Sequence, residues 1–158
     1  MAAAPLLDLS TIDLEQRIFG PEELRASLAQ RGTFEMLNGI IHRDVEAGLI
    51  VGYKVIRADD WWAADHIPGR PLFPGVLMIE AAAQLCSFDF DQRNPMGDAF
   101  VGFAGVGKTR FRGTVEPEGS LYFVGKLERL RSSMFTYAAQ GFYAGKLVLE
   151  TEVTGTVI

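Results

Sequence analysis

Glu80 is an ionisable residue in an otherwise apolar stretch, which makes it the first candidate for chemistry. The stretch Val76–Cys86 reads VLMIEAAAQLC, so Glu80 and Gln84 are its polar members. Burial favours the neutral form of a carboxyl, which can then act as a general acid near neutral pH. Gln84 lies four residues further on, on the same helical face, and its amide can hold the carboxyl. The alternative is that Glu80 lies at a polar edge of the helix.

His66 opens the segment HIPGRPLFPG, which ends at Gly75, immediately before the apolar stretch. Prolines at positions 68, 71 and 74 restrict the backbone there, so the segment should hold a side chain in a fixed place. Histidine is the natural base at neutral pH, although a loop histidine taken alone is more often simply hydrogen-bonded. The first N–H groups of a helix lack internal partners, so those of Gly75 and Val76 could stabilise an oxyanion.

The segment from His66 to Gln84 closely resembles the catalytic segment of the β-hydroxyacyl-acyl-carrier-protein dehydratases of the FabZ and FabA type. The His-to-Glu spacing, the Pro-Gly-Val-Leu before the helix and the Glu-Ala-x-Ala-Gln within it match that family. Glutamate at position 80 is typical of the FabZ branch, whereas the isomerising FabA branch has aspartate. A second likeness covers Phe103–Phe111, and a fainter one runs from Thr33 to the C-terminus. Residues 1–30 are not covered.

This resemblance implies an α+β hotdog fold, in which an antiparallel sheet wraps around one long buried central helix. It also implies a homodimer, with a trimer of dimers left open, whose sites combine the histidine of one subunit with the acid of the other. The implied reaction is reversible dehydration of a (3R)-3-hydroxyacyl thioester on acyl carrier protein to a trans-2-enoyl thioester, in fatty-acid or related lipid or polyketide synthesis. His66 would be the base, Glu80 the acid, and Gly75, Val76 and Gln84 would contact or position the substrate. No cofactor is expected.

Several positions depart from the family pattern and leave the substrate open. Asp65, Ile67 and Trp61-Trp62 replace other residues around the histidine, and the family's Pro-His-Arg-x-Pro-Phe element is reduced to residues 30–34. Two alternatives therefore stay open, a hotdog acyl thioesterase and a non-catalytic acyl-binding hotdog protein. Retention of both His66 and Glu80 favours dehydration.

The elements that must position these residues follow from the patterning. The chain of 158 residues predicts a single domain over residues 1–158, with residues 1–30 an atypical N-terminal extension. Proline at position 21 opens a short helix expected to reach Gln30. The apolar stretch predicts a helix from Val76 to about Asp91 that is apolar on nearly every face and should therefore be buried all round. Alternating or β-branched runs between turn residues predict the strands 33–43, 49–57, 99–115, 120–132, 134–144 and 146–157.

Composition excludes several classes of protein. The formal net charge of −5 argues against a general nucleic-acid binder. One cysteine and two histidines nearly exclude a zinc cluster. No secretory signal is evident, and no apolar run reaches the roughly 20 residues of a membrane span, so we expect a soluble cytoplasmic protein without membrane contacts.

Four further features could suggest other sites or functions. Residues 102–109 satisfy the P-loop pattern, but strand-like residues follow where a helix is needed, so we expect no nucleotide site. Cys86 is interpreted as a core residue and His42 as a surface residue at a strand end. A group of basic residues could form a docking patch for an acidic carrier protein, although ordinary solvated strand faces are the simpler interpretation. These residues are Lys108, Arg110, Arg112, Lys126, Arg129 and Arg131.

Overall fold

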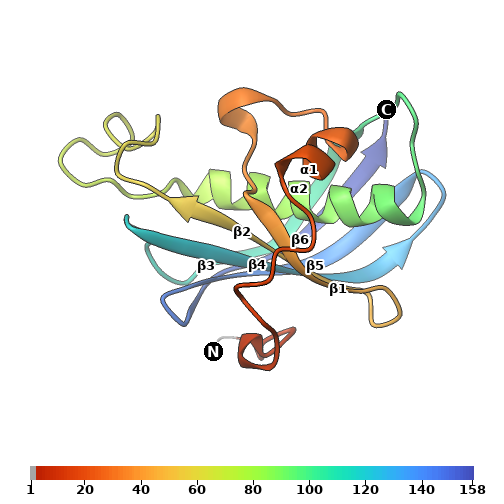
Figure 1. Ribbon diagram of the computed structural model, residues 1–158, viewed down its shortest axis with the longest axis horizontal. Coiled ribbons are helices and arrows are strands. Elements are labelled where there is room, and N and C mark those ends of the chain that lie inside the picture. Colours follow the sequence, from red (N-terminus) through yellow and green to blue (C-terminus); the bar gives the residue numbers. More distant parts are fainter. Residues whose placement is uncertain (1–2) are drawn as a thin grey trace.

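The computed structural model describes residues 3–158, which form an antiparallel sheet with a long helix against one face (Figure 1). The six strands pair in the order β1-β2-β4-β5-β6-β3. The strands are β1 (Gly39–Asp44), β2 (Leu49–Ile56), β3 (Val101–Phe111), β4 (Gly119–Leu130), β5 (Met134–Tyr143) and β6 (Lys146–Val157). The helices are α1 (Pro21–Ser27), α2 (Gly75–Arg93) and two short 3₁₀ turns, η1 (Leu9–Thr11) and η2 (Gly32–Phe34). The α+β arrangement expected from the sequence is confirmed.

The long helix α2 lies in the hollow of the sheet, with α1 on its other side (Figure 1). Twelve of its 19 residues are buried, including most of the run from Leu77 to Phe90. Side chains from every strand except β3 join α2 in two inner core clusters of buried residues. Burial is incomplete at the N-terminus of the helix, because Val76 is 70% exposed. The expectation that the helix is buried all round is wrong at this point.

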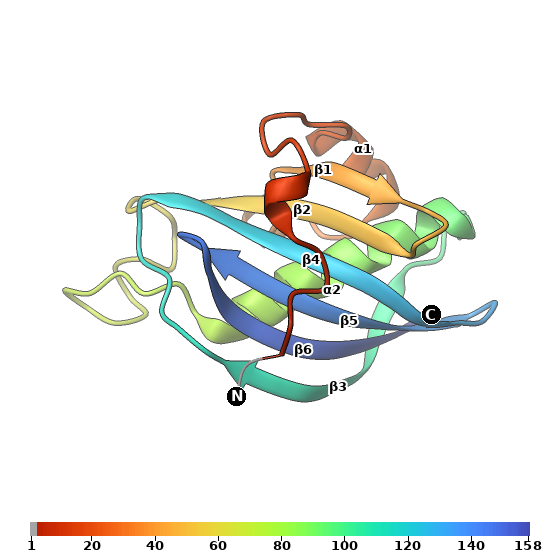
Figure 2. The same cartoon turned by 90° about the horizontal axis from the view of Figure 1, so that it is seen from below.

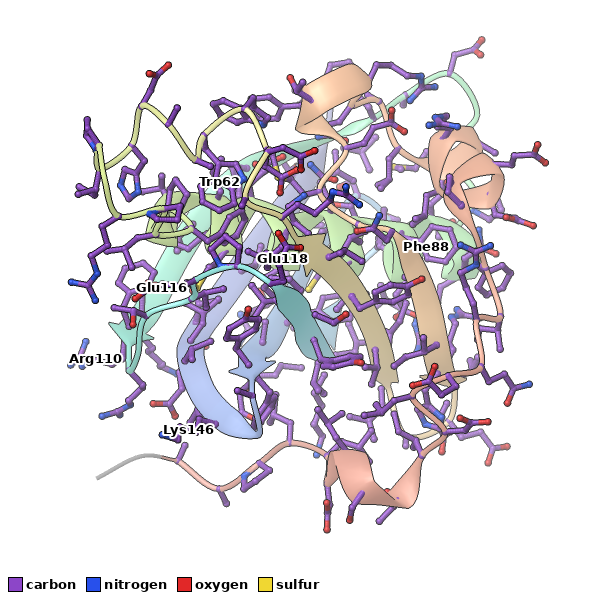
Figure 3. All side chains as sticks on the ribbon, turned by 60° about the vertical axis from the view of Figure 1, so that its left-hand side comes forward. Trp62, Phe88, Arg110, Glu116, Glu118 and Lys146 are labelled. Carbon is purple, nitrogen blue, oxygen red and sulfur yellow. The ribbon has the colours of Figure 1, made fainter. Side chains whose placement is uncertain are left out.

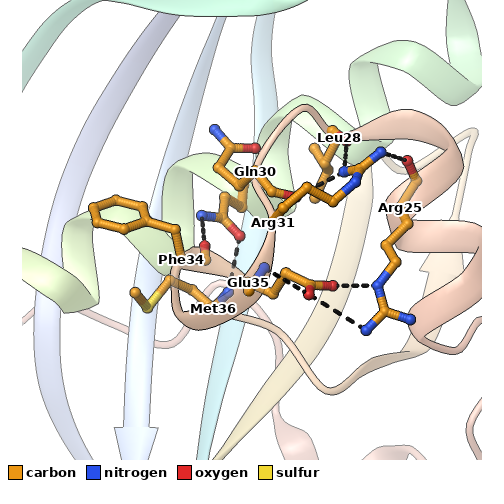
Figure 4. A network of polar contacts seen from close by, with 9 residues as sticks. Arg25, Leu28, Gln30, Arg31, Phe34, Glu35 and Met36 are labelled. Atoms are coloured by element: carbon orange, nitrogen blue, oxygen red, sulfur yellow. Dashed lines mark hydrogen bonds and ion pairs between the residues drawn. The ribbon is translucent and has the colours of Figure 1, made fainter. Parts of the chain in front are cut away.

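Two expected boundaries are wrong near the N-terminus. The helix predicted to reach Gln30 ends at Ser27. Beyond this end the Arg31 guanidinium donates hydrogen bonds to three carbonyl oxygens, those of Arg25, Leu28 and Gln30 (Figure 4). These bonds stabilise the end of a short helix that has no glycine cap. The first strand was predicted from residue 33 but begins at Gly39. Residues 32–34 instead form η2.

Residues before α1 cover part of the outer face of the sheet, away from α2. Figure 2 shows this N-terminal segment crossing the strands. Five of its apolar side chains pack against Ile41, Val51 and Val124, namely Leu6, Leu7, Leu9, Ile12 and Leu14. The Gln140 side chain fixes the segment through hydrogen bonds with Leu6 N and Ala4 O, at 2.7 and 3.0 Å. The lead-in expected to be irregular is thus packed against the sheet, although its backbone is mostly irregular.

A buried carboxylate ties the C-terminal half of α2 to the sheet. Asp89 is fully buried and accepts hydrogen bonds from Arg43 Nε on β1 and Arg93 Nε on α2, both at 2.7 Å. The Tyr137 hydroxyl on β5 donates a third bond to the same carboxylate. Burial raises the pKa of Tyr137 well above its usual range, and the negative charge of Asp89 raises it further. The hydroxyl therefore stays protonated and acts as a donor. Because a buried charge without partners is costly, these contacts fix the position of the helix.

We predict that Asp89→Asn lowers the free energy of unfolding by about 3 kcal/mol, because it leaves two largely buried arginines without their anion. Urea unfolding monitored by circular dichroism measures the change. Asp59→Asn is the matched control, because the side chains of Asp59 and Arg57 are 75% and 59% exposed and the pair is therefore worth little. If the Asp89 variant and the control were equally stable, the contacts of Asp89 would make no measurable contribution to the free energy of unfolding.

Candidate active site

The loop between β2 and α2 carries His66 and is fixed at three places. Ala58 N donates to Glu118 Oε1 at 2.9 Å, and Arg70 forms an ion pair with Glu116 at 3.1 Å. Phe73 N donates to Val115 O at 2.8 Å. Figure 3 shows Trp62, on this loop, near Glu116 and Glu118 on the segment between β3 and β4. The expected stiffness therefore comes from these bonds as well as from the prolines.

His66 is held in one orientation by its own loop. Its backbone N–H donates to Trp62 O at 2.9 Å, and its Nδ1 lies 2.8 Å from Leu72 O. A carbonyl oxygen can only accept, so Nδ1 carries the proton in this contact. In neutral imidazole the basic lone pair then belongs to Nε2. Since the His66 residue is exposed, this nitrogen can serve as a base toward a bound molecule.

An open pocket of about 400 Å³ places His66 beside the start of α2. It is lined by Trp61, Trp62, Asp65, His66, Pro74, Val76 and Leu77. Leu77 N bonds to Pro74 O at 3.0 Å, so the Gly75 and Val76 amides precede the first helical hydrogen bonds. A Cβ on Gly75 would lie 2.8 Å from Cε1 of Phe111. Glycine at this position therefore allows a ring from β3 to pack against the start of the helix.

Glu80 is half-buried further along α2 and is hydrogen-bonded as the sequence predicts. Its Oε1 accepts from Gln84 Nε2 at 2.8 Å. Gln84 also donates to Phe34 O at 2.9 Å and accepts from Met36 N at 3.0 Å. These two bonds draw residues 32–36 onto the helix, which explains why they form a turn instead of the predicted strand. Gln84 therefore contacts Glu80 and the N-terminal region.

Within the chain, His66 and Glu80 line different cavities. Glu80 lines a smaller one, of about 40 Å³, between α2 and β3. Glu80 lies five residues beyond Gly75, which is about 7.5 Å along the helix axis. The chain therefore does not bring the predicted pair together in a common pocket.

The edge strand β3 presents an apolar surface beside both cavities. Among the described residues β3 pairs with β6 alone, so its other edge has free backbone groups. Phe103, Val106 and Phe111 on this strand are each about half exposed, at 51%, 47% and 52%. An exposed apolar edge strand favours pairing with another chain.

The P-loop-like residues 102–109 lie within β3, which runs to Phe111, so no helix N-terminus follows them. Cys86 is fully buried in the core, and burial raises the pKa of its thiol well above the usual range. His42 is half-buried on β1, so the expectation of a surface residue is wrong. The first two observations agree with the interpretations from the sequence.

Three of the six basic residues share a groove with acidic side chains. Lys108, Arg129 and Arg131 line a groove of about 480 Å³ together with the acidic Glu128 and Glu152. Arg112, by contrast, forms an ion pair with Glu150, and its side chain is 30% exposed. Arg110 is exposed, and Figure 3 shows it at the end of the molecule that carries Glu116. A docking patch formed by these residues stays a prediction.

Sequence reasoning missed two buried polar groups. The pairing of Asp89 with Arg93 had a signal, because the two residues are four apart on a helix. Gln30 had none, since its surroundings come from distant parts of the chain. Its Oε1 is buried and has no hydrogen-bond partner among residues 3–158.

The FabA-like domain model matches residues 28–152. The chain is 33% identical over 128 residues to the 3-hydroxyacyl-[acyl-carrier-protein] dehydratase FabZ of Desulfotalea psychrophila, which covers 80% of this chain and 85% of the relative. It is 29% identical over 141 residues to the enzyme of the same name from Campylobacter jejuni, over 86% of this chain and 95% of the relative.

Solved structures show the same fold. The dehydratase heterocomplex ApeI:P from Xenorhabdus doucetiae matches with a TM-score of 0.71 at 11% identity, over 84% of this chain and 89% of that one. A thioesterase from Pseudomonas aeruginosa matches with a TM-score of 0.65 at 16% identity, over 92% and 99%. The hotdog fold expected from the sequence is confirmed. Because dehydratases and thioesterases share it, the fold does not by itself decide the reaction.

We predict that Gln84→Met, which keeps the side-chain length, lowers the free energy of unfolding by about 3 kcal/mol. The variant leaves the buried Met36 N–H without a partner, and removes the bonds to Phe34 O and Glu80. Thermal and urea unfolding measure the loss. Gln92→Met, an exposed position on the same helix, should change stability by less than about 0.5 kcal/mol. Similar values for the two variants would show that the Gln84 bonds add nothing.

Proposed function

Because the chain belongs to the FabA-like domain family, we propose that it catalyses the reversible dehydration of (3R)-3-hydroxyacyl-acyl-carrier-protein thioesters in fatty-acid or related lipid or polyketide synthesis. The observation that carries the proposal is the orientation of His66, whose Nδ1 is bound to Leu72 O and whose Nε2 is left as a base. In a hotdog thioesterase a carboxylate can activate water, whereas dehydration requires both a base for the C2 proton and an acid for the hydroxyl, and this chain carries both His66 and Glu80. Dehydration is therefore the reaction that fits the site better. We also propose that the protein acts in the cytoplasm. No helix among residues 3–158 has the length and apolar character to span a membrane.

The proposed mechanism uses two proton transfers. The thioester carbonyl lies against the amides of Gly75 and Val76 at the positive end of α2, which acidifies the proton on C2. His66 Nε2 removes that proton, the C3–O bond breaks, and Glu80 supplies the proton that converts the departing hydroxyl into water. The product is a trans-2-enoyl thioester. General acid–base help of this kind is worth about 10²–10⁴-fold in rate.

A homodimer is required if His66 and Glu80 are to act on one substrate. Pairing of two β3 edges would bury the exposed Phe103, Val106 and Phe111 and would bring the helix of one subunit beside the loop of the other. Each site would then combine the histidine of one protomer with the glutamate of its partner. Assembly into a trimer of dimers would leave these sites intact.

We predict that His66→Ala and Glu80→Gln each lower kcat by at least about 100-fold while the protein stays folded and dimeric. Hydration of a crotonyl thioester, followed by loss of the enoyl absorbance, measures the rate. Light scattering on the same samples reports the oligomer. A near-normal rate in either variant would remove that residue from the mechanism.

Mixing the two inactive variants tests whether sites are shared. Hybrid dimers contain one site with both groups intact and one with neither, so refolding the two variants together should restore up to about a quarter of the wild-type activity (half the dimers are hybrid, each with one working site of two). Refolding each variant alone is the control. No recovery in proven hybrid dimers would mean that each site uses residues of a single protomer.

The carrier protein is acidic in this proposal, so its docking depends on local positive charge against the net charge of −5. We predict that Arg110→Ala raises KM for carrier-bound substrate several-fold and weakens the salt dependence, because exposed charge pairs are screened. It should barely change kinetics with a short coenzyme A thioester. Lys146→Ala, at the exposed first residue of β6, is the control charge removal. If KM rose equally for both substrates, Arg110 would instead contribute to the fold.

A further inference from the structure

The pair Trp61-Trp62 belongs to the histidine loop, and the proposed mechanism gives it no role. The two side chains lie differently, because Trp62 is 2% exposed whereas Trp61 is 52% exposed. Trp62 packs edge-on against Phe73, with ring centroids 5.2 Å apart and an angle of 75° between the ring planes. Its carbonyl oxygen also accepts the His66 N–H at 2.9 Å. The buried ring thus fixes the segment and leaves the indole of Trp61 at the surface.

Trp61 lines the same open pocket of about 400 Å³ as His66, the proposed base. Val76 lines this pocket too and is 70% exposed. Single apolar side chains at a protein surface need no explanation, but here two of them lie in one pocket with the base. The volume falls within the range of small-molecule sites, which is about 300–1,000 Å³. The pocket therefore offers an apolar surface to a molecule bound beside His66.

The proposed reaction indicates which part of the substrate lies beside Trp61. The mechanism places the thioester carbonyl at the amides of Gly75 and Val76 and the C2 proton at His66. C3 and the acyl chain beyond it must lie toward the acid, which in the proposed homodimer comes from the second subunit. The sulfur is on the other side of the carbonyl carbon, and on a carrier protein it continues as the phosphopantetheine arm. Since that arm must reach the carrier in the solvent, an open pocket suits it.

We propose that Trp61 binds the pantetheine arm of the substrate, with its indole packed against the methylene groups and flat amides of the arm. An aromatic ring offers a large apolar contact area, and the backbone that carries this one is already fixed by Trp62. Asp65 lines the same pocket and can accept an amide N–H of the arm. This inference rests on the proposed function, because it assigns a place to part of that substrate. Trp61 then selects for the arm and has no role in proton transfer or in the choice of acyl chain.

Thioesters that differ in one part at a time test this assignment. Trp61→Ala should raise KM for hydration of crotonyl-pantetheine about tenfold at unchanged kcat, because a contact made equally in the ground state and the transition state affects KM alone. The factor should be the same for four-, six- and eight-carbon enoyl chains on the same arm. It should disappear for a crotonyl S-ethyl thioester, which has no arm.

Two variants are the controls for this measurement. Trp61→Phe keeps an aromatic face and should raise KM for crotonyl-pantetheine by no more than about twofold. Val45→Ala removes an exposed apolar side chain from the turn between β1 and β2, outside the pocket, and should behave as wild type. Circular dichroism and light scattering on every variant verify that the fold and the oligomer are retained.

Tryptophan fluorescence gives a second readout that does not depend on turnover. The chain has two tryptophans, and burial protects Trp62 from acrylamide, so quenching reports mainly on Trp61. Butyryl-pantetheine has neither a 3-hydroxyl group nor a double bond, so it can saturate the site without reacting. It should lower the acrylamide quenching constant of the wild-type protein, whereas a butyryl S-ethyl thioester should not. In Trp61→Phe neither compound should change the quenching.

Three results would overturn the inference. The first is a Trp61→Ala variant with wild-type KM for crotonyl-pantetheine. The second is a rise in KM that grows with acyl chain length or is equally large for the S-ethyl thioester, since the contact would then not be with the arm. The third is wild-type quenching that butyryl-pantetheine leaves unchanged.

Failure of the proposed function is separate from failure of this inference. A wild-type protein that hydrates no crotonyl thioester would contradict the proposed function, and the quenching experiment would still decide whether Trp61 binds the arm. An active wild type with an unaffected Trp61→Ala variant would remove the arm contact and leave the dehydratase assignment in place.

Discussion

The rest of the structure depends on the burial of α2, a helix that is apolar on nearly all its faces. Such a helix is stable in water only when other elements cover it, and the curved sheet covers one side while α1 and residues 28–37 cover another. Every polar group on this helix must then find a partner inside the protein. Asp89 and Gln84 find theirs on other elements, whereas Ser87 and Glu80 are hydrogen-bonded to residues of the helix itself.

The polar groups have different roles at different positions along the helix. Asp89, near its C-terminal end, is bound by Arg43 and Tyr137 and fixes the helix against the sheet. Gln84, near the middle, attaches the N-terminal region through Phe34 and Met36. Glu80 has fewer partners within the protein, and it lies toward the end where Val76 is exposed and the His66 loop begins. The polar groups far from the proposed catalytic site thus have the most hydrogen-bond partners. The Glu80 carboxyl, which can still accept hydrogen bonds, lies close to that site.

The positioning of His66 follows a different principle, since it lies on a loop. Ion pairing of Arg70 with Glu116 and the backbone bond from Phe73 to Val115 tie that loop to the segment after β3. One strand therefore influences both groups, because β3 leads into the segment that anchors the histidine loop and also lines the Glu80 cavity through Val101 and Phe103. In the proposed homodimer, its free edge is the surface at which the second subunit would complete the site. This arrangement explains how one fold can carry both dehydratases and thioesterases, since the reaction depends on the groups placed around the helix and not on the sheet.

The sequence by itself determined the central helix, the six strands to within a few residues at most boundaries, the Glu80–Gln84 contact and the candidate catalytic pair. These are local features, because periodicity, turn residues and i,i+4 spacing all act over a few neighbouring residues. Only the tertiary structure decided that residues 32–34 turn instead of extending, that Gln140 holds the N-terminal segment on the sheet, and that Gln30 reaches the Glu80 cavity from 50 positions away. The physical reason is that hydrogen-bond partners and cavity walls come from segments distant in the chain, and a pattern read along the sequence carries no information on which of them will meet.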